Sequence, residues 1–186
     1  MSRKSITAED RLPGDPTRDQ LVESIIRVDH AGEYGATRIY AGQLAVLGRT
    51  KSAAAIREMA EQEKAHLAHF ERLVAERRVR PTALSPLWHV AGFALGAATA
   101  LLGERAAMAC TEAVEEVIDE HYARQAEALG DDEAELRDAI LRYRDDEIAH
   151  RDLARAEGAA DAPGHELISE AVKAGSRLAI WLSTRL

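Results

Sequence analysis

The chain has 186 residues, 46% of them hydrophobic, so it can enclose a core and is short enough to form one domain. Its formal net charge of −8 argues against a nucleic-acid-binding protein, because such proteins are usually basic. The single cysteine, Cys110, excludes a disulfide bond within the chain and favours a reducing compartment. Residues 1–18 lack the apolar run of a secretory signal, and we expect a flexible tail there before one domain at 19–186.

Apolar residues that recur at helical spacing predict an all-helical chain without strands. The third expected helix is unusual, because residues 81–103 contain no charged side chain although 30% of the chain is charged. We expect one long helix to continue through this uncharged stretch. The expected helices cover residues 19–48, 51–78, about 86–129, 133–157 and 165–185.

Two of these helices carry the same short motif, Glu63-x-x-His66 and Glu147-x-x-His150. Residues three apart lie on the same face of a helix, so each motif offers a carboxylate and an imidazole to one metal ion. Either motif alone is weak evidence, because the same spacing occurs in exposed salt-bridge patterns. Both motifs here fall on the apolar stripes of their helices, where an unpaired carboxylate is costly to bury.

A further glutamate precedes each motif on the helix before it. Glu33 has this place in the first half, and Glu112, Glu115 and Glu116 compete for it in the second. Glu115 is in phase with the apolar positions of its helix, and Glu116 falls on a more polar face. Glu112 shares the stripe of Glu115 one turn earlier, so phase alone does not exclude it. We select Glu115.

The resulting pattern, a glutamate helix followed by a Glu-x-x-His helix, occurs twice, as in ferritin-like four-helix bundles with a carboxylate-bridged pair of metal ions. Four carboxylates and two imidazoles suit iron or manganese better than zinc, which prefers fewer ligands. Asp29 and Asp146 are candidate hydrogen-bond acceptors for the ligand histidines, or else solvated carboxylates. The expected ligands are Glu33, Glu63, His66, Glu115, Glu147 and His150.

Three segments, Arg27–Gly42, Ala109–Glu116 and Arg177–Leu186, resemble the demethoxyubiquinone hydroxylases, which are membrane-bound di-iron enzymes of ubiquinone biosynthesis. The resemblance covers nearly the whole chain after Asp19. It implies a ferritin-like four-helix bundle with additional membrane-associating and C-terminal helices. It also implies the same six metal ligands that helical phase selects.

The resemblance implies 3-demethoxyubiquinol 3-hydroxylation, in which O2 hydroxylates the ring of a 2-polyprenyl-3-methyl-6-methoxy-1,4-benzoquinol. Two Fe ions per chain, electrons from NADH or another reductant, and other ubiquinone-biosynthesis proteins as partners are expected with it. His121 and Tyr122 match a His-Tyr pair that is linked in this family to electron delivery. Ordinary packing at a helix face is the alternative role for this pair.

The uncharged residues 84–103 are long enough for a membrane-spanning helix, but their glycines and alanines make them only moderately apolar. We expect them to insert into the membrane surface, with Trp88 at the headgroup boundary and the preceding arginines against anionic lipids. A buried helix or an oligomer contact is the alternative. The expected location is the cytoplasmic side of a bacterial inner membrane, or the matrix side of the mitochondrial inner membrane.

Two other functions share parts of this pattern. An iron-storage bundle would use the same ligands and assemble into a shell, but it would not need the uncharged segment. A structural helical protein could contain both Glu-x-x-His motifs by coincidence.

Overall fold

The computed structural model describes residues 14–186, and every regular element among them is helical. The expected all-helical fold class is therefore confirmed. Most of the expected tail, residues 1–13, lies outside the described residues, and the division into a tail and one domain stays a prediction. The elements are α1 (Arg18–Leu47), α2 (Ala53–Glu76), α3 (Ser85–Leu101), α4 (Glu104–Leu129), α5 (Ala134–Ala156), a 3₁₀ turn (Ala159–Asp161) and α6 (His165–Ser183).

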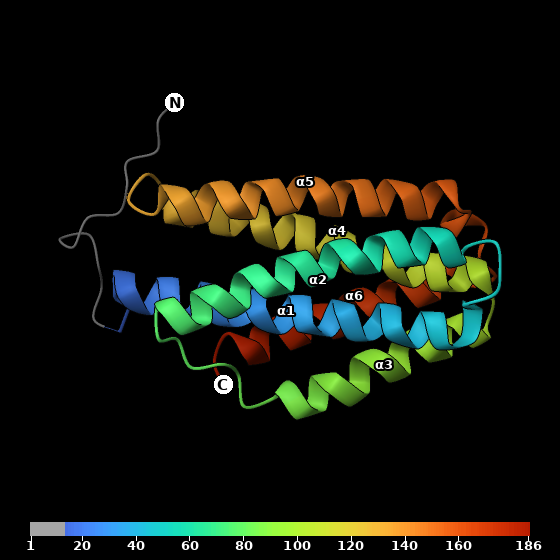
Figure 1. Cartoon of the computed structure of the whole chain (residues 1–186), viewed down its shortest axis with the longest axis horizontal. Coiled ribbons are helices and arrows are strands. Elements are labelled where there is room, and N and C mark those ends of the chain that lie inside the picture. The colour runs from blue at the N-terminus through green and yellow to red at the C-terminus, as the bar shows by residue number, and fades with distance from the viewer. Residues whose placement is uncertain (1–13) are drawn as a thin grey trace.

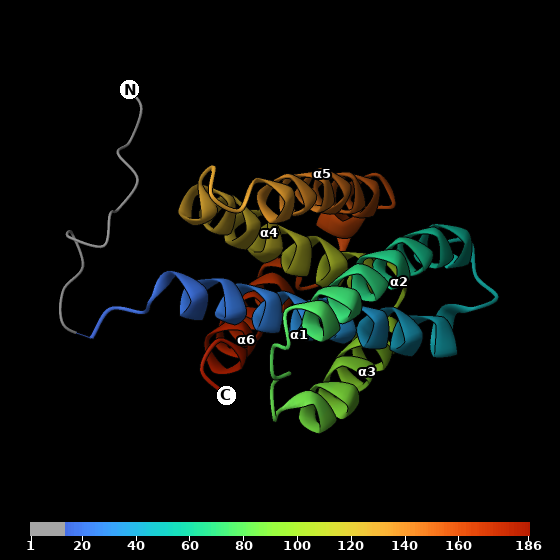
Figure 2. The same ribbon diagram turned by 60° about the vertical axis from the view of Figure 1, so that its left-hand side comes forward.

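Helices α1, α2, α4 and α5 form a four-helix bundle (Figure 1). Within it, α1 packs along α2, and α4 packs along α5. The other two helices lie outside the bundle, α3 against α1 and α6 mainly against α4. Figures 1 and 2 both show α3 on the side of α1 that faces away from α5, and both show the C-terminal end of α6 on that side. The chain therefore has the expected bundle with two additional helices.

The core of the bundle is divided by a layer of buried polar side chains. One apolar cluster includes Tyr40, Ile56 and Met108 toward one end of the bundle, and a second includes Ile26 and Leu129 toward the other. Burial of each large apolar side chain contributes about 1.5–3 kcal/mol, so the two clusters can stabilise a bundle that also encloses charged groups. The polar layer between them is where the expected metal ligands lie.

The expected single helix at about 86–129 is wrong, because α3 ends at Leu101 and α4 begins at Glu104. Gly103 between them has a φ of 119°, a backbone conformation that side chains with a Cβ rarely adopt. The chain changes direction at this glycine. As a result, the uncharged segment packs outside the bundle as α3, while α4 enters the bundle as a separate helix.

Glycines on α1 and α3 allow these two helices to approach closely. A Cβ built on Gly96 would lie 2.0 Å from the backbone oxygen of Ile39, and one built on Gly42 would lie 2.2 Å from that of Phe93. Side chains at these positions would force the helices apart. Because Gly42 and Gly96 have no side chain, the backbones of α1 and α3 can pack directly against each other.

Large apolar side chains are exposed mainly along α3, along α6 and just after them. Trp181 on α6 is 52% exposed, whereas Trp88 is half-buried and donates a hydrogen bond from Nε1 to Ser183 Oγ at 2.9 Å. The expected contact of Trp88 with lipid headgroups stays a prediction. No helix within residues 14–186 combines the length and the apolar character needed to cross a membrane. The exposed large apolar side chains on α3, on α6 and just after them are Leu87, Val90, Leu101, Leu102, Leu167, Leu178, Trp181 and Leu186.

Candidate metal centre

The four bundle helices bring all six expected ligands together at one buried centre. They form two overlapping groups, and within each group the possible ligand atoms lie within 4.8 Å of one another. Glu63 and Glu147 belong to both groups, as bridging carboxylates between two metal ions would. One group adds Glu33 and His66 to this pair, and the other adds Glu115 and His150.

Several polar atoms at this centre are buried without a hydrogen-bond partner, including Glu33 Oε2, Glu63 Oε1 and Glu147 Oε2. The Nδ1 atoms of His66 and His150 share this property. His150 Nδ1 lies 3.2 Å from Glu63 Oε1 and 3.2 Å from Glu147 Oε2. Unsatisfied buried carboxylates are costly, and a cation between them removes that cost. Four carboxylates also balance the charge of two divalent cations, so the donor set fits a pair of metal ions.

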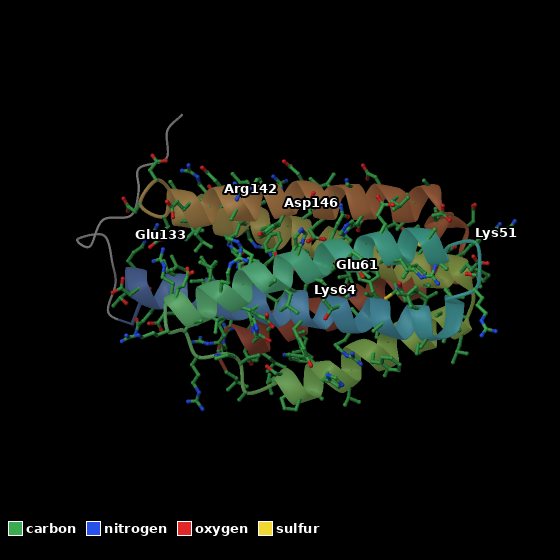
Figure 3. All side chains as sticks on the ribbon, viewed as in Figure 1. Lys51, Glu61, Lys64, Glu133, Arg142 and Asp146 are labelled. Carbon is green, nitrogen blue, oxygen red and sulfur yellow. The ribbon has the colours of Figure 1, made fainter. Side chains whose placement is uncertain are left out.

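Hydrogen bonds behind the two histidines orient their rings. His66 Nε2 lies 3.0 Å from Asp146 Oδ2, so Asp146 is the acceptor that the sequence suggested (labelled on α5 in Figure 3). His150 Nε2 lies 2.6 Å from Gln62 Oε1, a partner that sequence reasoning missed. Both contacts leave Nδ1 facing the carboxylates, as an imidazole must to bind a metal ion there. Asp29, the other suggested acceptor, contacts neither ligand histidine and lies beside His121 instead.

Two buried tyrosines donate hydrogen bonds to Glu33 and Glu115, each of which belongs to only one of the two ligand groups. The Tyr40 hydroxyl donates to Glu115 Oε1 at 2.9 Å, and the Tyr122 hydroxyl donates to Glu33 Oε1. Burial raises the pKa of both tyrosines well above the usual value, and the nearby carboxylates raise it further, so both remain donors. The expected role of His121 and Tyr122 in electron delivery stays a prediction.

The two alternatives to Glu115 point elsewhere. Glu112 accepts from Arg155 Nε at 2.6 Å and lies 2.8 Å from His165 Nε2. Glu116 contacts Arg155 and Lys173. Both glutamates therefore join α4 to α5 and α6, and only Glu115 faces the centre.

The centre holds protons tightly in the metal-free protein. Burial raises the pKa of Glu63 and Glu115 well above the usual value, and the neighbouring carboxylates, Glu147 first among them, raise it further. Burial disfavours the charged form of His66, but the Glu147 and Glu33 carboxylates outweigh it and raise its pKa to about 10. Burial lowers the pKa of His150. Metal ions that bind here must displace these protons.

A cavity of about 400 Å³ lies between α1, α3, α4 and α6, lined mainly by apolar side chains such as Ile39, Leu95 and Ile180. A small pocket of about 30 Å³ lies beside it, lined by side chains of the centre that include Glu33 and Glu115. An apolar space between the two additional helices therefore leads to the carboxylates. Both spaces share the lining residues Val28, Gly32, Ala36, Val114, Ile118 and Ile180.

The family model and the relatives that match this chain all belong to ubiquinone biosynthesis. Residues 20–183 match the family model described as "Ubiquinone biosynthesis protein COQ7". A 3-demethoxyubiquinol 3-hydroxylase of Rhodospirillum rubrum is 59% identical over 97% of this chain and 85% of its own. The human mitochondrial NADPH-dependent 3-demethoxyubiquinone 3-hydroxylase is 52% identical over 89% and 78%. The mitochondrial 5-demethoxyubiquinone hydroxylase of Saccharomyces cerevisiae is 39% identical over 89% and 78%.

Proposed function

The chain belongs to the COQ7 family of ubiquinone biosynthesis proteins, and we propose on this premise that it is a 3-demethoxyubiquinol 3-hydroxylase. The substrate is a polyprenyl benzoquinol. One oxygen atom of O2 replaces a ring hydrogen with a hydroxyl group, and the other leaves as water after uptake of two electrons and two protons. The buried centre of six ligands beside an apolar cavity is the observation that carries this proposal.

The six side chains would hold two iron ions. Glu63 and Glu147 would lie between the ions, with Glu33 and His66 on one and Glu115 and His150 on the other. Such a pair of ions supplies the electrons and the Lewis acidity that O2 activation needs. Manganese suits the same donors, but the hydroxylase names of the relatives favour iron. NADPH appears in the name of the human relative, and a nicotinamide nucleotide or another reductant would renew the electrons.

The protein around the ions binds and orients the quinol. The cavity between α3 and α6 is large and apolar enough for the first part of a polyprenyl chain, with the ring at its inner end beside Glu33 and Glu115. Its apolar walls exclude water from the ring, which limits loss of the oxidant to side reactions. Tyr40 and Tyr122 keep their glutamates in fixed positions by hydrogen bonding.

We further propose that α3 and α6 rest on a membrane surface, through the 84–103 region and the exposed apolar side chains of α6. A polyprenyl quinol is dissolved in the bilayer, and the cavity lies between the two helices that carry these side chains. The similarity to a bacterial enzyme favours the cytoplasmic side of a bacterial inner membrane over a mitochondrial location. Other ubiquinone-biosynthesis proteins are proposed partners on the same membrane.

The function can be tested in a bacterial strain that lacks its own hydroxylase. The unchanged chain should restore ubiquinone, whereas Glu147→Ala should accumulate the demethoxy precursor, because a bridging ligand is lost. Glu61→Ala is the control, since this glutamate is exposed on the outer face of α2 (Figure 3). Lipid extracts analysed by mass spectrometry give the result.

Metal analysis of the purified chain should find about two irons per chain. Normal ubiquinone in the Glu147→Ala strain would refute the proposal. A large soluble shell with far more iron would favour the iron-storage function instead.

A further inference from the structure

Asp29 carries a buried carboxylate oxygen that no described group satisfies. Its side chain has no exposed surface. Oδ1 accepts a hydrogen bond from Gln125 Nε2 at 2.7 Å, but Oδ2 has no hydrogen-bond partner. An unpaired buried carboxylate oxygen costs free energy, so this atom is suited to a ligand that brings a hydrogen-bond donor.

The position of Asp29 identifies where that ligand would be. Asp29 lies one helical turn before Glu33 on the same face of α1, and both residues line the small pocket of about 30 Å³. This volume is about that of one water molecule, so it admits a hydroxyl group but not a ring. The adjoining cavity of about 400 Å³ is large enough for the ring. A ring at the inner end of the cavity can therefore direct one substituent toward Asp29.

The chemistry of the substrate matches this arrangement. In the proposed quinol, the carbon that is hydroxylated is next to a carbon that carries a hydroxyl group. That hydroxyl is a hydrogen-bond donor, whereas the oxidised quinone has a carbonyl, which only accepts. Burial raises the pKa of the Asp29 carboxyl, whereas its contacts with His121 and Gln125 lower it and favour the ionised form, which only accepts. Asp29 Oδ2 can therefore pair with the reduced ring and is unfavourable to the oxidised one.

We propose that Asp29 Oδ2 accepts the hydrogen bond of the ring hydroxyl next to the reacting carbon, and so selects the quinol over the quinone. The inference rests on the proposed function and adds a specificity residue to it. The contact also orients the ring, because it brings the neighbouring C–H toward Glu33 and Glu115, which line the same pocket.

Gln125 is the positioning residue for this contact. Its Nε2 donates to Asp29 Oδ1 and lies 2.8 Å from His121 Nε2, so one amide is shared between the two side chains. This shared donor occupies Oδ1 and leaves Oδ2 as the oxygen without a partner. His121 Nε2 also lies 3.4 Å from Asp29 Oδ1.

The substitution Asp29→Asn tests the inference, because it keeps the shape of the side chain. The Gln125 amide selects the oxygen of the new amide at Oδ1, which places an NH2 donor where Oδ2 was. The iron-loaded protein is titrated anaerobically with a short-chain demethoxyquinol and with its quinone, by calorimetry. The unchanged protein should bind the quinol about tenfold or more tightly than the quinone, and Asp29→Asn should lose or reverse this preference. Asp138→Asn, an exposed aspartate on α5, is the matched control.

A second measurement needs no variant. An analogue with hydrogen in place of the hydroxyl next to the reacting carbon should bind the unchanged protein about tenfold more weakly than the quinol. Equal affinity for the analogue and the quinol, or an Asp29→Asn protein that keeps its quinol preference, would overturn the inference while hydroxylation by the unchanged protein still stands. An unchanged protein that neither binds nor hydroxylates the quinol would refute the proposed function itself.

Discussion

The two ligand histidines have different hydrogen-bond acceptors behind them. His66 faces the carboxylate of Asp146, and His150 faces the neutral amide of Gln62. A carboxylate makes the imidazole that donates to it a stronger base than an amide does, so the two halves of the centre are electronically unequal. The pKa values of the two rings also differ, but for another reason: the Glu147 and Glu33 carboxylates raise that of His66, whereas burial lowers that of His150.

These pKa shifts predict that the metal-free protein loses stability as the pH rises from 7 to 9. The pKa of His66 is about 10 in the folded protein, against 6.5 for the free side chain. Its contribution to stability is complete below pH 6.5 and is lost as the pH rises through about 10. The raised pKa values of Glu63 and Glu115 act in the same direction. The loss should approach about 1.4 kcal/mol per pH unit for one proton, measured by urea unfolding after chelation.

His66→Gln is the control, because it removes the titrating ring and should reduce the pH dependence. Loading with metal should also reduce it, because the ions replace the protons. A metal-free protein that is equally stable at pH 7 and pH 9 would contradict the prediction.

The sequence indicated the six expected ligands and one of their hydrogen-bond partners, Asp146, but not the other partners. Helical phase alone selected Glu115 over Glu116, and the structure places Glu115 at the centre. Neither Tyr40 nor Gln62 could be identified in the same way. Each makes its contact with a residue on another helix, and such contacts depend on the rotation and separation of packed helices, which the pattern within one helix does not contain.

At the scale of elements, the close contact between α1 and α3 makes Gly96 sensitive to substitution. Gly96→Ala would place a Cβ 2.0 Å from the Ile39 backbone oxygen, so α3 must move away from α1. Overpacking of this kind costs about 1–3 kcal/mol of unfolding free energy, which urea unfolding can measure. Gly175→Ala on α6 is the matched control, since a Cβ there meets nothing within 4 Å, and it should be neutral or stabilising. Equal stability of the two variants would contradict this account.

The helices themselves were largely predictable, with bounds for α1, α2, α5 and α6 close to those expected. The break between α3 and α4 was not. Small and apolar residues occur on both sides of Gly103, so the helical pattern continues through it, and a single glycine in a helix is tolerated at a cost of about 1 kcal/mol. The change of direction is decided by the packing of α3 on α1, which the local pattern does not report.

At the scale of the whole molecule, the exposed apolar side chains of α3 and α6 should bind lipid. Val90 and Trp181 are 65% and 52% exposed and line neither cavity. Val90→Ser with Trp181→Ser should weaken binding to liposomes by about tenfold or more, because burial of each side chain is worth about 1.5–3 kcal/mol. Flotation of the protein with anionic liposomes measures the effect. Leu141→Ser, on α5 at the other side of the bundle, should change nothing, and unchanged flotation of the double variant would count against the membrane surface.

The two overlapping ligand groups have a consequence for how the molecule unfolds. The first group takes three side chains from α1 and α2 and one, Glu147, from α5. The second takes three from α4 and α5 and one, Glu63, from α2. Neither the α1–α2 hairpin nor the α4–α5 hairpin therefore supplies all the ligands of one group by itself. A cation in either group would cross-link the two halves of the chain, so metal loading should make them melt as one cooperative unit.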